Sequence, residues 1–267
     1  MYLSNERDFR KITKEEQAEY ERIQSLETPP GRKFGRINKY SEYPLAVKKY
    51  LSLFPNNYLV LGDLKKEQDL HKINEDFNSL IHQQQTKETN VLHFINHTPA
   101  FHIIGAILQK ANFGVGHHGM YIFPEFRLGE QYRADYLIAA CGSGGVEFVF
   151  VELESPNKKV VLKNGQIAKT LRDGCGQIND WKRWVENNFS ALREFFEAEK
   201  NPNENLPKEF IEFDSSRMHY VVVGGLRSYY NEEAYRNQRE QTNGGVTILH
   251  YDNLYDYAER LLRYSTF

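Results

Sequence analysis

Cysteine, long hydrophobic runs and net charge are all scarce in this sequence, and each absence excludes a class of protein. The two cysteines, Cys141 and Cys175, stand beside glycines and form no CxxC pair, so we expect neither a disulfide scaffold nor a zinc site. No apolar run approaches the ~20 residues that span a bilayer. The start MYLSNERDFRK is too charged for a signal peptide. These features predict a soluble, cytoplasmic protein with no membrane partner.

The formal charge of -2 gives the chain no global basic character that would indicate a nucleic-acid partner. A nuclease needs only a local positive surface around an acidic site, so this class stays open. Hydrophobic residues make up 40% of the chain and aromatic residues 13%, which is enough for a packed core. The length of 267 residues suits one large domain, or a medium domain with a smaller one.

The chain changes character near Lys87. Before this point the sequence is charged and patchy, with helices predicted at 14–23 and 63–85, and we find no functional motif in it. After this point the patterns of helices and strands are clearer. We therefore expect residues 1–87 to form an N-terminal accessory region of unknown role and residues 88–267 to form the main domain.

The main domain reads as an alternation of helices and strands. Thr98 and Pro99 predict a helix start, since threonine caps helices well and proline suits the first helical position. Three successive strands joined by short turns predict an antiparallel meander, at 120–128, 134–140 and 146–153. Two later strands alternate with helices and predict parallel crossover pairing: strands 218–225 and 246–251, helices 166–196, 232–241 and 254–264. We expect an α/β (α+β) fold with helices on both faces of a mixed central sheet.

Three carboxylates close the second and third of these strands. Asp135 lies in the second strand, and Glu152 and Glu154 end the third on one face, because side chains alternate across a strand. Burying such carboxylates is costly without a counter-charge, which a divalent cation would supply. Asp135, Glu152 and the backbone carbonyl of Leu153 are therefore candidate metal ligands. On spacing alone, glutamates that reach solvent at a strand end are an equally good interpretation.

Four short motifs follow one another in the main domain. They are PEFRLG with Glu125, R-x-D-[FY] at Arg133–Tyr136, E-L-x-x-P at Glu152–Pro156, and Q-I-x-D-W at Gln177–Trp181. In this order the motifs resemble the C-terminal domain of Shedu-type anti-phage defence proteins, in the PD-(D/E)xK nuclease superfamily. The resemblance covers roughly residues 92–262. It implies a restriction-endonuclease-like fold for residues 88–267 and a metal-dependent endonuclease that cleaves DNA.

The resemblance also implies roles for individual residues. Asp135 and Glu152 would hold one or two Mg²⁺ (or Mn²⁺) ions, Glu154 would orient or deprotonate the attacking water, and Gln177 would touch substrate or water. Glu125 either reaches the metal or faces solvent. The family usually carries lysine where this chain has Glu154. Lysine stabilises the negative charge that develops on the phosphate, which Glu154 cannot do, although a glutamate can still act as a base.

A locally basic segment follows Pro156. We expect its five cations to contact nucleic acid: Lys158, Lys159, Lys163, Lys169 and Arg172. For any single lysine an ordinary solvated surface is an equally good interpretation. Lys169 is also a candidate to restore the missing positive charge. His117 and His118 lack a partner motif, so we expect a turn with exposed imidazoles there rather than a metal site.

Three functional hypotheses follow. The first is an active, metal-dependent DNA endonuclease in prokaryotic defence. The second, motivated by Glu154, is a catalytically impaired nuclease-fold module that binds DNA or senses a phage component. The third is a structural role in which residues 1–87 drive assembly. The resemblance implies a homo-oligomer, which the residues themselves do not indicate.

Overall fold

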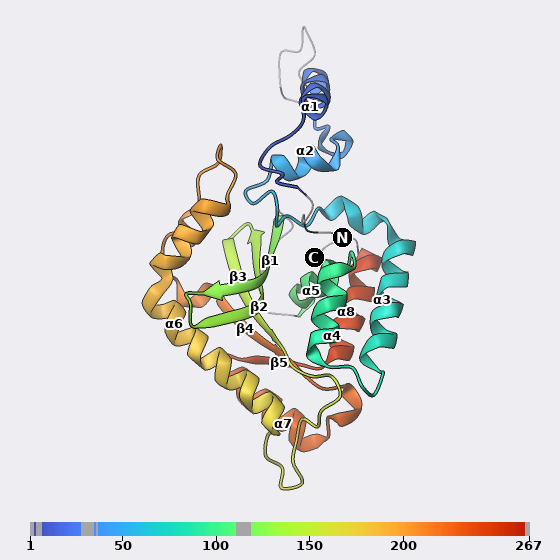
Figure 1. The fold of residues 1–267 in the computed structure, drawn as a ribbon, viewed down its shortest axis with the longest axis vertical. Coiled ribbons are helices and arrows are strands. Elements are labelled where there is room, and N and C mark those ends of the chain that lie inside the picture. Colours follow the sequence, from blue (N-terminus) through green and yellow to red (C-terminus); the bar gives the residue numbers. More distant parts are fainter. Residues whose placement is uncertain (1–2, 4–6, 28–34, 36, 111–118, 265–267) are drawn as a thin grey trace.

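A mixed five-stranded sheet lies at the centre of the computed structural model, which describes all residues except 1–2, 4–6, 28–34, 36, 111–118 and 265–267 (Figure 1). Its strands follow one another in chain order: β1 Gly119–Leu128, β2 Tyr132–Gly142, β3 Gly145–Leu153, β4 Met218–Val223 and β5 Thr247–Leu249. The first three strands pair antiparallel, and β3 pairs with β4, and β4 with β5, in parallel. The predicted meander and the predicted crossover strands are both confirmed.

Helices flank both faces of this sheet, so the fold is α+β as predicted. The helices of the described chain are α1 Lys14–Glu27, α2 Leu45–Tyr50, α3 Glu67–Ile81, α4 Glu88–His97, α5 Phe101–Gly105, α6 Lys169–Glu199, α7 Glu232–Asn243 and α8 Tyr251–Tyr264, of which α1 and α2 lie apart from the sheet. The long helix α6 covers one face, and α3, α4, α5 and α8 lie on the other (Figure 1). Each face has its own hydrophobic core, called here the α6-side core and the α8-side core.

The alternation of β3 explains why both faces are covered. Phe148 and Phe150 pack in the α6-side core with Trp181, whereas Val149 and Val151 pack in the α8-side core. All four of these strand residues are almost completely buried. A strand that is apolar on both faces needs a layer on each side, because either uncovered face would leave large apolar area in water.

The predicted helix start at Thr98 is wrong. The structure has α4 ending at His97, and the backbone N–H of Thr98 still donates to the carbonyl of Phe94 at 2.9 Å. Thr98 itself is extended, with φ -109° and ψ 156°. The ring of the following Pro99 disfavours helical geometry at Thr98, so the proline marks the end of one helix instead of the beginning of the next.

Helix α6 continues through Gly174. Its non-helical residue lies further along, at Asn188, with φ -131° and ψ 22°. A Cβ at Gly174 would lie 3.0 Å from the Glu154 Oε1 and 3.0 Å from the Val222 Cγ1. The glycine thus lets α6 approach the end of the sheet closely, next to the acidic residues.

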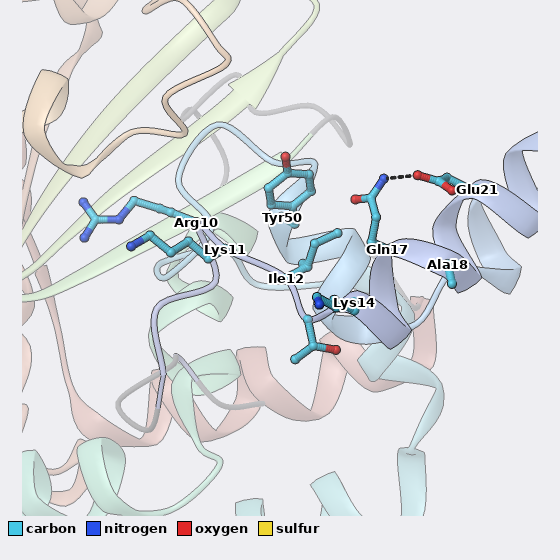
Figure 2. Close-up of a pocket in the computed structure, with 9 residues that line it drawn as sticks. Arg10, Lys11, Ile12, Lys14, Gln17, Ala18, Glu21 and Tyr50 are labelled. Atoms are coloured by element: carbon cyan, nitrogen blue, oxygen red, sulfur yellow. Dashed lines mark hydrogen bonds between the residues drawn. The ribbon is translucent and has the colours of Figure 1, made fainter.

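The region before Lys87 divides between two sets of contacts. Ile23, Tyr43 and Val47 form a small cluster of their own around α1 and α2. A pocket of about 510 Å³ lies beside this cluster, lined among others by Arg10, Lys14 and Tyr50 (Figure 2). By contrast, α3 packs against α8 and shares the α8-side core. The division at residue 87 stays a prediction.

No described helix by itself has the length and apolar composition to cross a bilayer. The segments Glu88–His97 and Phe101–Gln109 meet those two criteria only when taken together, and they are bent by 112° at their break.

Candidate active site

Asp135 lies where β2 and β3 stop pairing. The last paired residues of the two strands are Tyr136 and Val151. One residue further, the Asp135 Oδ2 accepts a hydrogen bond from the backbone N–H of Leu153 at 2.7 Å. The side chain therefore replaces a backbone partner at the end of the ladder. This contact holds Asp135 beside the part of β3 that carries Glu152.

Glu125 distorts the neighbouring strand β1 opposite Asp135. It has φ 48°, the left-handed region, and is the non-glycine residue with positive φ in the described chain. On β1, Phe123 and Phe126 consequently both pack in the α6-side core, although three positions separate them. The Glu125 carboxylate is exposed and forms an ion pair with Arg133 at 3.0 Å. Its contact with a metal stays a prediction.

Glu152 is the most buried of the acidic residues, with 6% of its surface exposed. It lies in β3 opposite Val222 of β4, whose side chain packs in the α6-side core. Burial, together with the negative charges of Asp135, Glu154 and Glu88, raises the pKa of Glu152 to about 9. A hydrogen bond with Gln177 of α6 acts in the opposite direction. The catalytic role of Gln177 stays a prediction.

Glu154 follows β3 and is partly buried. Its backbone is held on both sides, because its N–H donates to the carbonyl of Val223 at 2.7 Å and its carbonyl accepts from the hydroxyl of Tyr251 at 2.7 Å. Burial is the main cause that raises the pKa of Glu154 to about 7; Glu88, Asp173 and Asp135 also raise it, and Lys169 lowers it. The side chain is therefore near the midpoint of its titration at neutral pH.

Asp135 is the third acidic residue of the candidate site. Burial raises its pKa to about 7, against the lowering effect of the Leu153 N–H, and the charge of Glu88 raises it as well. In the part of the chain that the structure describes, no ion pair within 4.0 Å is recorded for Asp135, Glu152 or Glu154. We call these three residues the acidic cluster. The charges of Arg133 and Lys169 lower the pKa values of Asp135 and Glu154, but less than burial raises them.

Glu88 is a fourth acidic residue of this site, and the sequence analysis missed it. It is the first residue of α4 and is partly buried, which raises the pKa of its carboxyl. Its charge acts on all three members of the acidic cluster. The predicted helix start at Thr98 concealed it, since a helix beginning at Glu88 would have pointed to an acidic residue at its N-terminus.

The donor set of the acidic cluster suits a hard divalent cation, which prefers carboxylate, carbonyl and water oxygens. Among the described residues, no group of three or more His, Cys, Asp or Glu side chains is arranged to hold a metal ion. Magnesium commonly uses one or two protein carboxylates together with waters and substrate phosphates. Asp135 and Glu152 lie on adjacent strands and supply two carboxylates, the number that such a magnesium site needs from the protein. The Leu153 carbonyl stays a predicted third ligand.

The five cations selected from the sequence are all exposed, and those with described surroundings belong to different local structures. Lys158 lines a groove together with Glu88. Lys163 stands in the loop whose Gly165 carbonyl accepts from Asn237 of α7. Lys169 begins α6 and pairs with Asp173 at 3.5 Å. His117 and His118 lie outside the described residues.

A family model described as "Shedu protein SduA, C-terminal" matches residues 48–255 of the chain. The match contains the acidic cluster, Glu88 and the whole central sheet. No curated protein matches the sequence.

Proposed function

The chain belongs to the Shedu family, which indicates a role in anti-phage defence, and we propose that it performs this role as a metal-dependent DNA endonuclease. One observation carries the proposal. Asp135, Glu152 and Glu154 come together at the end of two adjacent strands, Glu152 is buried, and the described residues hold no ion-pair partner for any of them. Uncompensated buried carboxylates are unfavourable unless a ligand supplies positive charge.

Each residue has a distinct task in this proposal. Asp135 and Glu152, with the Leu153 carbonyl, would hold Mg²⁺ or Mn²⁺. Such a cation lowers the pKa of a bound water and polarises the phosphate. Glu154 accepts the proton of the attacking water, for which a pKa near 7 is suitable. Gln177 keeps the Glu152 carboxylate in its orientation through their hydrogen bond.

A second function has one specific observation in its favour. Glu154 occupies the place of the usual lysine, and the nearest candidate to replace that lysine, Lys169, is exposed and paired with Asp173. A site without a suitably placed cation stabilises the charge of the transition state less well. The alternative is therefore a nuclease-fold module that binds DNA without cleaving it.

The deciding experiment is a cleavage assay on plasmid and linear DNA with Mg²⁺, Mn²⁺ or a chelator. We expect cleavage only with a divalent ion, and a loss of roughly 10²–10⁴-fold in rate in Asp135→Ala and in Glu152→Ala. Glu212→Ala removes an exposed carboxylate away from the acidic cluster and serves as the control. Wild-type activity in both site variants would refute the site, whereas binding without cleavage under every ion would favour the alternative. A homo-oligomer stays a prediction, testable by light scattering of the same samples.

A further inference from the structure

A groove of about 590 Å³ opens beside the acidic cluster. Two segments that are far apart in the sequence line it, namely residues 84–89, which connect α3 to α4, and the residues that follow β3: Ser155, Asn157 and Lys158. Its volume is within the range of ~300–1,000 Å³ that is usual for ligand sites. In Figure 1 the first segment is the turn from α3 into α4.

The groove and the acidic cluster are continuous. Glu88 belongs to both, since it lines the groove and its charge acts on Asp135 and Glu152. Ser155, another lining residue, directly follows Glu154 in the chain. A polymer that presents one phosphate to the acidic cluster would therefore place a neighbouring part of its chain in the groove.

Hydrogen bonds join the two segments that line the groove. The side-chain amide of Asn157 donates to the carbonyl of Gln83 at 2.6 Å and to that of Thr86 at 3.1 Å. The hydroxyl of Thr86 donates to the carbonyl of Leu80 at 2.7 Å, which ties the first segment to the end of α3. These contacts fix the groove before any ligand arrives, so little ordering of the protein would oppose binding.

The remaining lining residues suit a phosphodiester backbone. Lys87 and Lys158 contribute one cation from each segment, both side chains are exposed, and no ion pair is recorded for either within the described residues. Gln84, Gln85, Thr89 and Ser155 add amide and hydroxyl groups. Phosphate oxygens are bound by lysine and by such neutral donors. Two cations here would also offset the repulsion between the acidic cluster and an anionic polymer.

We propose that this groove holds the phosphodiester backbone next to the scissile phosphate, with Lys87 and Lys158 each neutralising one phosphate. The inference rests on the proposed function for the identity of the ligand as a nucleic acid. It adds Lys87, which no motif indicates, and it selects Lys158 from the five cations of the basic segment. The other four are not required by it.

Fluorescence anisotropy of a labelled DNA duplex at several NaCl concentrations tests the groove. All proteins carry Glu152→Gln so that the probe is not consumed, and Lys87→Gln/Lys158→Gln is compared with the matched pair Lys72→Gln/Lys208→Gln, two exposed lysines outside the groove. We expect the groove pair to weaken binding about tenfold or more and to reduce the salt slope by roughly 1.8, which corresponds to two lost phosphate contacts. The control pair, with the same loss of charge, should change neither quantity by a comparable amount.

Lys87→Arg/Lys158→Arg should retain the salt slope, and circular dichroism should confirm that every variant is folded. Equal effects of the groove pair and the control pair, or a parent protein that binds no DNA, would overturn the inference. The endonuclease proposal has its own test. If the groove lysines bind DNA but the wild-type chain cleaves it under no divalent ion, the groove proposal is supported and the endonuclease proposal is wrong.

Discussion

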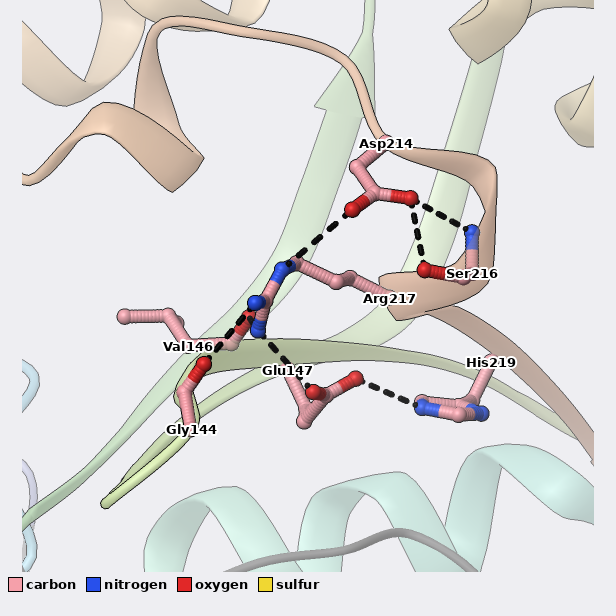
Figure 3. Close-up of polar contacts among 7 residues, drawn as sticks. All are labelled: Gly144, Val146, Glu147, Asp214, Ser216, Arg217 and His219. Carbon is pink, nitrogen blue, oxygen red and sulfur yellow. Dashed lines mark hydrogen bonds and ion pairs between the residues drawn. The ribbon is translucent and has the colours of Figure 1, made fainter.

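The two ends of strand β3 carry carboxylates in opposite electrostatic surroundings, one partly buried and one buried. At its beginning, Glu147 lies between two basic side chains, 3.1 Å from the Nη1 of Arg217 and 3.0 Å from the Nε2 of His219 (Figure 3). Arg217 extends the network to Asp214 at 3.5 Å and to the carbonyl of Gly144 at 2.8 Å. Every charge in this group has a partner of the opposite sign or a polar acceptor within the protein.

At the other end of the same strand, Glu152 has acidic neighbours instead. Asp135 and Glu154 raise its pKa, and only the uncharged Gln177 offers it a hydrogen bond. The comparison separates two uses of a carboxylate. Where the protein supplies the counter-charge, as at Glu147, the carboxylate stabilises the fold; where it does not, as at Glu152, burial of the carboxylate costs stability, and under the proposed function an external cation would offset that cost.

The strongest test of this contrast applies one substitution to both ends. Glu147→Gln leaves Arg217 with Asp214 as its remaining carboxylate and removes the carboxylate beside His219, and we expect a loss of about 1–3 kcal/mol in the free energy of unfolding at pH 8 without metal. At pH 8 the folded chain must either protonate Glu152, whose pKa is about 9, or bury its charge without a counter-ion; Glu152→Gln removes this cost, and we expect a gain of about 0.5–2 kcal/mol. Urea denaturation measures both.

The order of the two variants by cleavage rate should be the opposite of their order by stability. Glu147→Gln keeps cleavage close to the wild-type rate, whereas Glu152→Gln loses it. The exposed Glu212→Gln should change stability by less than about 0.5 kcal/mol. Effects of the same sign on stability at positions 147 and 152 would contradict the claim that Glu147 stabilises the fold and Glu152 destabilises it.

The pH dependence of stability gives the second test. The pKa values of Asp135 and Glu154 are raised to about 7 and that of Glu152 to about 9, all above the ordinary values of 3.8 and 4.5. Between these limits the folded chain binds more protons than the unfolded chain, so stability falls as pH rises. In a chelator, the wild-type melting temperature should therefore decline from pH 5 to pH 9 by more than that of Glu152→Gln.

Added Mg²⁺ should reverse this decline, because a ligand that binds only the folded state stabilises it by roughly 2.7 kcal/mol at a hundred times its dissociation constant. The same addition should have little effect on Glu152→Gln. If Mg²⁺ raised the melting temperature of both proteins equally, the cation would be binding somewhere other than the acidic cluster.

The smallest expected effect concerns Tyr251, which is completely buried and donates from its hydroxyl to the Glu154 carbonyl. Tyr251→Phe should cost about 1 kcal/mol of stability. Because the hydroxyl positions the turn that carries Glu154, kcat should fall severalfold while KM stays unchanged. Tyr255→Phe, four residues further along α8, removes a hydroxyl that donates to Glu75 and should leave kcat unchanged. Equal kcat values in the two variants would assign Tyr251 a structural role only.

Much of the fold could be predicted because each element carries its pattern locally. Phe148, Val149, Phe150 and Val151 form an unbroken apolar run, and such a run predicts a strand covered on both faces. The short glycine turn before β3 predicted an antiparallel neighbour, which brought Asp135 next to Glu152. The start of α4 was missed because Thr98 and Pro99 fit a helix beginning as well as a helix end, and only hydrogen bonding distinguishes the two.

The sequence by itself determined the family, the succession of strands and helices, and the acidic residues near the point where β2 and β3 stop pairing. These features depend on residue type and on spacing along one segment. Tertiary structure alone decided which charges are compensated. The pairing of Glu147 with Arg217 joins positions 70 residues apart, and the approach of Glu88 and Lys87 to the end of β3 joins α4 to the sheet. Electrostatic energy depends on distance and burial in space, which order along the chain does not specify.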